Sequence, residues 1–359
     1  MNIWPAVALA VILAAPIHAR AEAINTAGET GAYHRDFCPG LERDLKAAKF
    51  DYACATSAGS IDNIKRTLAN PKQIGFAQFD IFARETAKLP GAPLAVIRQD
   101  FGRECLFMVT RNKTIKSYGE VAALAEHLRF VLPRQGSGSA ATFEFLQRID
   151  PEGLGRAKSV TYAADADAAL AETLDGAEDM VTLFVQFPDP ENPRFKLIDD
   201  KAGQFIPVID RAVLRQEING QKVYYAQETE ITSPKFLKKG ESVITSCTPV
   251  TLFTGSPERV PAGVERANHI DMIRTIAALD RAALLPPEGF FTTLLKRTKE
   301  LSADGLEQAV QMSEQARKDA APLINRLKEE TARLRREAEE LKRRAEEEAD
   351  KLLGERKTR

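Results

Sequence analysis

Residues 24–80 alternate short apolar runs with amphipathic ones, and this alternation limits the fold more than any other feature of the chain. The expected order is strand, helix, strand, helix, strand, at residues 24–27, 37–50, 52–56, 61–68 and 73–77. Strands that are separated by helices run parallel, because a helical crossover returns the chain to the same end of the sheet. This part of the sequence therefore predicts an α/β lobe with a parallel sheet and helices on both faces.

Three loops follow the predicted strands, at residues 28–33, 57–60 and 78–80. In a parallel sheet the loops at the carboxyl ends of the strands meet at one edge, and ligands bind there. The three loops are therefore expected to line one side of a binding site.

A second alternation begins after Lys116 and predicts a second α/β lobe. In it, a strand at residues 130–132 leads through Gly136-Ser137-Gly138-Ser139 into a helix. The first turn of a helix has unpaired N–H donors and a partial positive charge, so this loop suits a carboxylate or a phosphate. The alternative is a plain tight turn that needs glycine for its backbone alone.

Strand-rich residues 93–110 and 242–253 flank the second alternation. We expect the chain to leave the first lobe near residue 110 and to return near residue 248, which gives two crossing segments at a hinge. The expected divisions are a signal peptide at 1–21, the first lobe at 22–110, the second lobe at 111–247, the return to the first lobe at 248–300 and a charged helix or coiled coil at 301–359.

The N-terminus has the pattern of an export signal. Residues 3–17 are apolar and too short to span a bilayer as a helix, and Ala19 and Ala21 fit a signal-peptidase site. Cleavage is expected after Ala21 or Ala23, although no Lys or Arg precedes the apolar run, and a buried first helix is the alternative. A periplasmic location is the expectation.

Four cysteines lie beyond the signal, which suggests disulfide bonds in an exported protein. Four cysteines allow three pairings. The expected topology brings Cys105 near Cys247 at the hinge, and Cys38 in the first helix near Cys54 in the adjacent strand. These two pairs are therefore favoured.

From Leu306 the chain is rich in Glu, Arg, Lys and Ala. Leu327, Leu334 and Leu341 recur every seven residues, but Glu348 takes the next place. A long helix is expected, which acts as a spacer, an oligomerisation arm or a handle for a partner. Because small residues face the leucine seam, the sequence leaves open whether residues 306–359 self-associate.

Neither charge nor motif indicates nucleic-acid binding or catalysis. The formal net charge is −1, which gives no field to attract nucleic acid. No G-x-S-x-G occurs, and His34, His127 and His269 lie away from the glycine loops and from other metal ligands. We expect that the protein is not an enzyme and that it binds no metal and no cofactor.

Four segments carry glycine and small polar residues in a fixed order, at residues 26–33, 55–64, 75–80 and 136–139. They read Thr-Ala-Gly-Glu-Thr-Gly-Ala-Tyr, Ala-Thr-Ser-Ala-Gly-Ser-Ile-Asp-Asn-Ile, Gly-Phe-Ala-Gln-Phe-Asp and Gly-Ser-Gly-Ser. In this order they resemble the TAXI-type periplasmic solute-binding proteins, the receptors of a class of TRAP transporters. The resemblance covers about residues 23–290 and implies a two-lobed type 2 periplasmic-binding-protein fold.

The resemblance also implies a site and a ligand. It implies a small carboxylate, such as glutamate or another organic acid, held by the side chains of Tyr33, Ser57, Ser60, Gln78, Ser137 and Ser139 and by the backbone amides of Gly31, Gly59 and Gly138. Arg134 could supply a cation beside the glycine loop, and a solvated surface arginine is the alternative.

The expected function is to capture this acid between the lobes and to deliver it to TRAP-type membrane subunits. A sensor or interaction protein on the same scaffold, with the C-terminal helix as its output, is the alternative.

Overall fold

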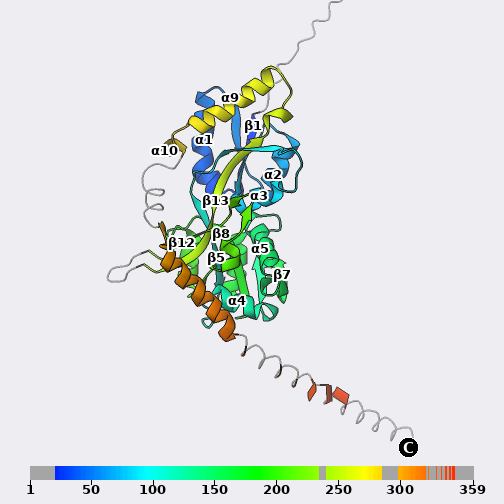
Figure 1. Cartoon of the computed structure of the whole chain (residues 1–359), viewed down its shortest axis with the longest axis vertical. Helices are drawn as coiled ribbons and strands as arrows, with labels where there is room; N and C mark the ends of the chain where they lie inside the picture. Colours follow the sequence, from blue (N-terminus) through cyan, green and yellow to red (C-terminus); the bar gives the residue numbers. More distant parts are fainter. Residues whose placement is uncertain are drawn as a thin grey trace, which may run out of the picture.

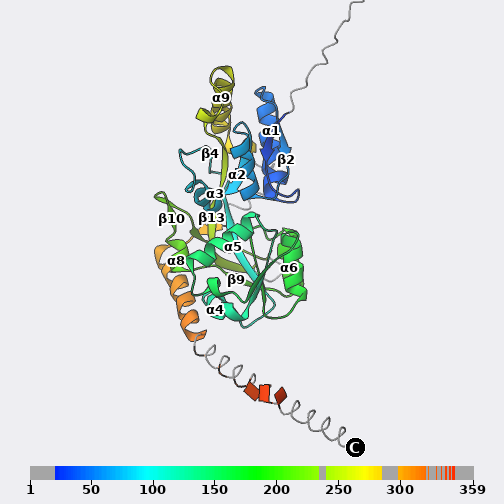
Figure 2. The same ribbon diagram turned by 90° about the vertical axis from the view of Figure 1, so that its right-hand side faces the viewer.

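The chain folds into two α/β lobes joined by two crossing segments (Figure 1, Figure 2). The structure is a computed structural model and describes residues 21–233, 240–284 and 298–320, with a few single residues beyond 320. The expected export signal lies outside the described residues, apart from Ala21. Within the described ranges, no helix has both the length and the apolar character that crossing a membrane requires.

The first lobe has a sheet with the strand order β2-β1-β3-β13-β4. The parallel strands are β1 (Glu22–Asn25), β2 (Tyr52–Ala55) and β3 (Ile74–Gln78). The antiparallel strands are β13 (Ser242–Gly255) and β4 (Leu94–Arg98). The helices that follow β1, β2 and β3 are η1 (Tyr33–Phe37) with α1 (Cys38–Ala47), α2 (Ser60–Ala69) and α3 (Phe79–Thr86). The predicted parallel lobe is confirmed.

The second lobe repeats this plan with the order β7-β6-β8-β5-β9. Its parallel strands are β6 (Arg129–Leu132), β7 (Ser159–Tyr162) and β8 (Met180–Gln186). Its antiparallel strands are β5 (Arg103–Thr110) and β9 (Gln204–Pro207). The helices that follow β6, β7 and β8 are α5 (Gly138–Ile149), α6 (Ala166–Asp175) and α7 (Pro193–Asp200). In each lobe the fourth strand of the sheet comes from the hinge, β13 in the first lobe and β5 in the second, as expected for the two-lobed type 2 fold.

The remaining elements surround these sheets. The helices are α4 (Tyr118–Leu124), η2 (Ala125–His127), η3 (Leu154–Arg156), α8 (Arg211–Leu214), η4 (Pro257–Arg259), α9 (Val264–Ala278) and α10 (Arg281–Leu284). The strands are β10 (Glu217–Ile218), β11 (Gln221–Lys222), β12 (Tyr225–Glu230) and β14 (Thr298–Glu300). Helices α9 and α10 pack on α1 in the first lobe.

The first crossing lies earlier than the sequence predicts. β5 was expected in the first lobe, but it pairs with β8 and β9 in the second, so the chain crosses between β4 and β5. The second crossing is within β13, which pairs with β5 up to Pro249 and with β3 from Val250. At the other end, β14 pairs with β12 in the second lobe, although residues 248–300 were expected to stay in the first. These strands find partners far away in sequence, which local patterns do not reveal.

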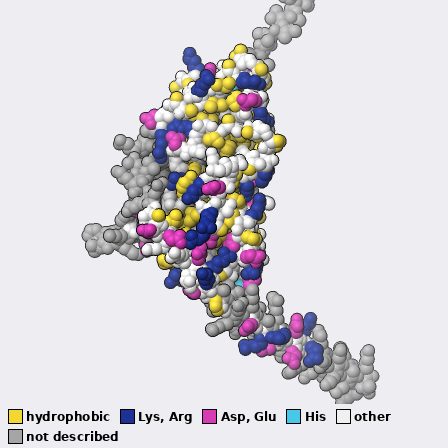
Figure 3. All heavy atoms as spheres, viewed as in Figure 1, with side chains coloured by type: hydrophobic (Ala, Val, Ile, Leu, Met, Phe, Trp, Pro, Cys, Tyr) yellow, Lys and Arg dark blue, Asp and Glu magenta, His cyan; other side chains and the backbone are white. Residues whose placement is uncertain are grey.

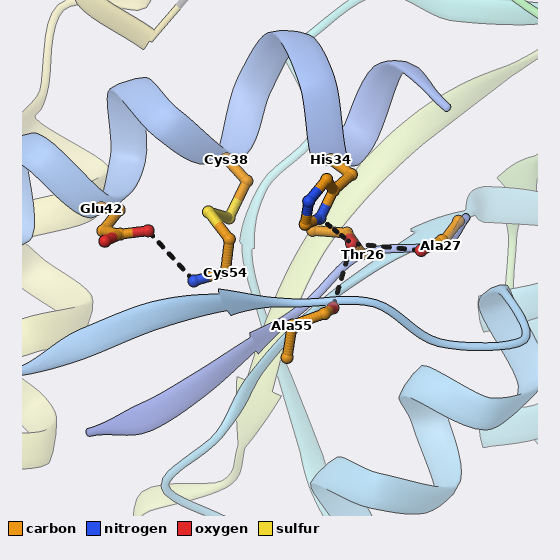
Figure 4. The surroundings of a disulfide bond; sticks show 7 residues. All are labelled: Thr26, Ala27, His34, Cys38, Glu42, Cys54 and Ala55. Atoms are coloured by element: carbon orange, nitrogen blue, oxygen red, sulfur yellow. Dashed lines mark hydrogen bonds between the residues drawn. A yellow bond between two sulfur atoms is a disulfide. The ribbon is translucent and has the colours of Figure 1, made fainter. Parts of the chain in front are cut away.

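Two disulfides have the favoured pairing. Cys38 of α1 is joined to Cys54 of β2, and Figure 4 shows this bond between the helix and the strand beneath it. Glu42, one turn further along α1, accepts a hydrogen bond from the Cys54 N–H. Cys105 and Cys247 face each other on β5 and β13 and link the two crossing strands.

The C-terminal helix begins on the second lobe. Residues 303–320 are helical and lie along this lobe (Figure 1, Figure 2). Val310 and Ser313 are both 3% exposed, and Val310 joins the main apolar core. This part of the charged segment therefore contributes to the apolar core. The predicted heptad leucines lie outside the described residues.

Candidate functional site

A cavity of about 220 Å³ lies between the lobes. It is lined by loops that follow β1, β2 and β3 in the first lobe and β6, β7 and β8 in the second. Because both lobes have parallel strands with the same order, the carboxyl ends of all six strands face one interlobe space. The predicted loops at residues 28–33 and 57–60 meet the Gly136–Ser139 loop there, together with Gln78.

All ten residues predicted to contact a ligand line this cavity. They are Gly31, Tyr33, Ser57, Gly59, Ser60, Gln78, Arg134, Ser137, Gly138 and Ser139. The structure thus brings them together, and their contact with a ligand stays a prediction.

Three helical segments begin at the cavity. The η1–α1 segment starts at Tyr33, α2 starts at Ser60 after Gly59, and α5 starts at Gly138 after its N-cap Ser137. N–H groups in the first turn of a helix have no acceptor within the helix. The three termini therefore direct donors and partial positive charge toward one small space.

The four serine hydroxyls hold the loops in place. Ser57 donates to the Thr26 carbonyl and accepts from the Gly59 N–H. The hydroxyls of the other three accept backbone N–H bonds, from Gln78 to Ser60, from Ala140 to Ser137 and from Val185 to Ser139. A hydroxyl that accepts a bond can still donate its own proton. Three hydroxyl protons thus remain for a ligand in this cavity.

A buried carboxyl group lies at the hinge side of the cavity. Glu104 on β5 is 7% exposed, and the Tyr33 hydroxyl donates a hydrogen bond of 2.5 Å to its Oε2. Burial raises the pKa of Glu104 to about 8, although hydrogen bonds from Tyr33 and Gln78 favour the ionised form. We call Tyr33, Gln78 and Glu104 the hinge cluster.

The arginines at the cavity have protein partners. Arg194 of α7 donates to Asp167 and to Gln186 Oε1. Arg35 pairs with Asp36, and Arg134 donates to the Ala164 carbonyl while its side chain is exposed. An anion in the cavity would therefore interact mainly with the helix termini and the hydroxyls. The guanidinium groups would attract it less strongly, because they already interact with partners in the protein.

The lobes touch each other beside the cavity. A Cβ added to Gly138 would lie 2.0 Å from Gln78 Oε1, and one added to Gly59 would lie 3.2 Å from the Ser137 Cα. Phe187, which follows β8, packs edge-on against Phe37 of the first lobe with 5.3 Å between ring centroids. This conformation is closed, since no side chain separates the two glycine loops.

Sequence reasoning missed most of the second lobe's contribution. No motif marks the lining residues at 164–166, 185–187, 189, 192 and 194. The strands before them were predicted. Loops at the carboxyl ends of parallel strands meet at one edge of the sheet, and this edge rule located the loops of the first lobe. Applied to the second lobe, it would also have located these residues. Glu104 carries no comparable signal, because it is a single acid within a strand.

Comparisons with known proteins give matches to solved structures only at low sequence identity and with TM-scores below 0.5. No family model and no curated protein matches the chain. A solved structure of a periplasmic transporter covers 85% of this chain and 96% of its own, at 10% identity and a TM-score of 0.43. The CA3427 gene product of Candida albicans, described as having the generic periplasmic binding protein fold, covers 84% and 90%, at 11% identity and a TM-score of 0.44. The GluR0 ligand-binding core in complex with L-glutamate covers 74% and 97%, at 9% identity and a TM-score of 0.40.

Proposed function

We propose that this protein is a non-catalytic, exported binding protein that closes its two lobes around one small carboxylate. The observation that carries the proposal is the convergence of three helix N-termini and three free hydroxyl protons, from both lobes, on one cavity. These groups are donors, and a carboxylate accepts hydrogen bonds only. Hydrogen bonds to a charged acceptor are about twice as strong as those between neutral groups.

Closure of the lobes would retain the ligand. The free energy for closure comes from contacts that both lobes make with the ligand at once. The cavity of about 220 Å³ suits a metabolite with few heavy atoms. Delivery of this acid to TRAP-type membrane subunits is the transport role that follows from the sequence resemblance. The two disulfides support a location in an oxidising compartment such as the periplasm.

Ligand-dependent melting tests the proposal. Amino acids, hydroxy acids and dicarboxylates would be added singly to the full-length mature protein. A ligand at a hundred times its dissociation constant should stabilise the folded protein by about 2.7 kcal/mol. The matched variant Gly138→Ala should show a clearly smaller response, because its new methyl group would occupy space beside Gln78. No shift with any acid would contradict carboxylate binding.

A sensor role is the second candidate, and the docked C-terminal helix favours it. Val310 of the helix is buried in the apolar core and Ser313 bonds Gly119 of α4, so the helix is attached to the second lobe and would move with it during closure. Sedimentation of the chain with and without residues 321–359 would test whether this segment assembles copies. If the protein is a monomer both with and without this segment, self-association is not the way in which the sensor signals.

A further inference from the structure

Two buried polar atoms at the cavity have no hydrogen-bond partner within the described structure. They are Gln78 Oε1, an acceptor, and Gln186 Nε2, a donor. Both side chains line the cavity, and they are 4% and 7% exposed. An unpaired buried polar atom destabilises the folded protein, so a native site normally supplies a partner. A plain carboxylate could pair with the donor, but it could not pair with the acceptor.

Further acceptor capacity lies in the same hinge cluster. Glu104 adds a carboxyl group, whose Oε2 accepts a hydrogen bond from the Tyr33 hydroxyl. The charged groups around it are Asp80 of α3 and Arg194 of α7, and Arg194 is bound to Asp167. No side-chain cation in the described residues forms an ion pair with Glu104. A cationic group of the ligand would therefore complete this cluster.

We propose that Glu104 is a specificity-determining residue that binds an ammonium group of the ligand and releases a proton when it does so. The inference rests on the proposed carboxylate binding and deepens it, because the ligand class becomes small acids that also carry a primary amine. Glu104 passes from carboxylic acid to carboxylate, its proton goes to solvent, and the ligand remains an ammonium. The helix termini hold the carboxylate of the same ligand.

The other acids of the cavity are less suited to this task. Asp165 is exposed and caps α6 by accepting the Ala168 N–H, and Asp189 accepts the Glu191 N–H. An exposed carboxylate such as that of Asp165 discriminates weakly, since water competes for the cation. The half-buried Asp189 already lies near the Arg35 guanidinium. A pair formed with buried Glu104 is shielded from water, so a ligand that lacks the ammonium leaves an acceptor unpaired there.

The proton release follows from the state of Glu104 in the empty cavity. With a pKa of about 8, about nine-tenths of these side chains are neutral at pH 7. Each binding event should then release nearly one proton. The affinity should rise about tenfold per pH unit between pH 6 and 7.5 and level off above about pH 8.

Calorimetry on the full-length mature protein tests this with two matched pairs of probes, glutamate with 2-hydroxyglutarate and alanine with lactate. Titration at pH 7 in two buffers of different ionisation enthalpy counts the protons released. We expect close to one proton for the amine of the pair that binds and close to none for its hydroxy acid. Glu104→Gln should abolish the release and reduce the amine preference by about tenfold or more. Glu152→Gln, at an exposed position in the turn after α5, should keep both.

The outcomes separate the two proposals. If the hydroxy acids bind as well as the amines and neither releases a proton, carboxylate binding stands and the role of Glu104 is overturned. If no acid of either pair binds, both proposals fail. The pH profile of the unmodified protein needs no variant: an affinity for the amine that is flat from pH 6 to 8 would overturn the role of Glu104 even if Glu104→Gln did not fold.

Discussion

Thr142 of α5 donates a hydrogen bond to Asp80 of α3, with 2.6 Å between Oγ1 and Oδ2, and this bond joins the two lobes. The Tyr224 hydroxyl donates to the same oxygen at 2.8 Å, and Arg84 of α3 reaches the Ala141 carbonyl at 2.9 Å. Asp80 is completely buried, and burial raises its pKa in spite of these donors. The closed conformation thus depends on a carboxyl group that the opposite lobe satisfies.

Removal of one donor should weaken this contact. In Thr142→Val the side chain keeps its shape and loses its hydroxyl, which leaves Asp80 with one bond fewer. We expect the free energy of unfolding to fall by about 1–3 kcal/mol in urea titrations at pH 7. Thr161→Val on the exposed strand β7 is the control and should change it by less than about 0.5 kcal/mol. Equal effects of the two substitutions would mean that Asp80 does not need the opposite lobe.

The fold and most of the cavity could be predicted because they follow from local patterns. Alternating strands and helices fixed the parallel sheets, and the loops at residues 28–33, 57–60 and 136–139 reached the cavity as the edge rule requires. The favoured disulfides followed from the same topology.

What could not be predicted depends on contacts between distant segments. β5 has the same apolar pattern in either lobe, and only its pairing with β8 assigns it to the second. Glu104 matters because Tyr33 and Gln78 surround it, and those residues lie on other elements. The docking of residues 303–320 uses Val310 and Ser313. Ser313 lies two heptads before Leu327, but Ser313 and Ala320 are small, so the leucine repeat does not mark this part of the helix.

The buried carboxyl of Glu104 should cost stability at alkaline pH. Its pKa is about 8 in the folded protein and near the ordinary value of 4.5 in the unfolded chain. The folded state therefore holds an extra proton between these values, so stability falls as pH rises from about 5 to 8. Glu104→Gln removes this cost and should be more stable than the parent at pH 8.5, by on the order of 3–5 kcal/mol. Urea titrations at pH 5, 7 and 8.5 measure the difference, which should shrink toward pH 5. A difference that stayed constant across this range would contradict a raised pKa.

Gly138 should be needed for closure. A methyl group at this position would lie 2.0 Å from Gln78 Oε1 and 3.0 Å from Ser60 Oγ, both in the first lobe. Gln78 and Ser60 are only 4% and 2% exposed, so these side chains have little room to move aside. Gly138→Ala should therefore hold the lobes apart and weaken ligand binding by about tenfold or more, while the alanine favours helix α5. Small-angle scattering of the free protein would detect the more open shape. Gly305→Ala, whose nearest neighbours are side-chain atoms at 3.3 and 3.5 Å, should leave shape and affinity unchanged.

The C-terminal helix should depend on packing more than on the exposed ion pairs of Arg211. Figure 3 shows Lys, Arg, Asp and Glu side chains mixed over this face of the molecule. Arg211, which bonds Glu307 and Glu314, is 33% exposed, and its partners are 50% and 38% exposed, so each pair contributes about 0–1 kcal/mol. Gly119 of α4 instead lies under the helix, where its N–H donates to Ser313 Oγ at 3.2 Å.

A methyl group at Gly119 would meet the Ser313 carbonyl oxygen at 2.0 Å and the Arg317 Cβ at 3.0 Å, both in the helix. Gly119→Ala should displace the helix even though alanine favours α4 itself, because backbone atoms cannot move aside as a side chain can. Hydrogen exchange followed by mass spectrometry should show faster exchange in residues 303–320 for Gly119→Ala and little change for Arg211→Ala. If Arg211→Ala released the helix and Gly119→Ala did not, surface charge would hold it, and the buried contacts of Val310 and Ser313 would be secondary.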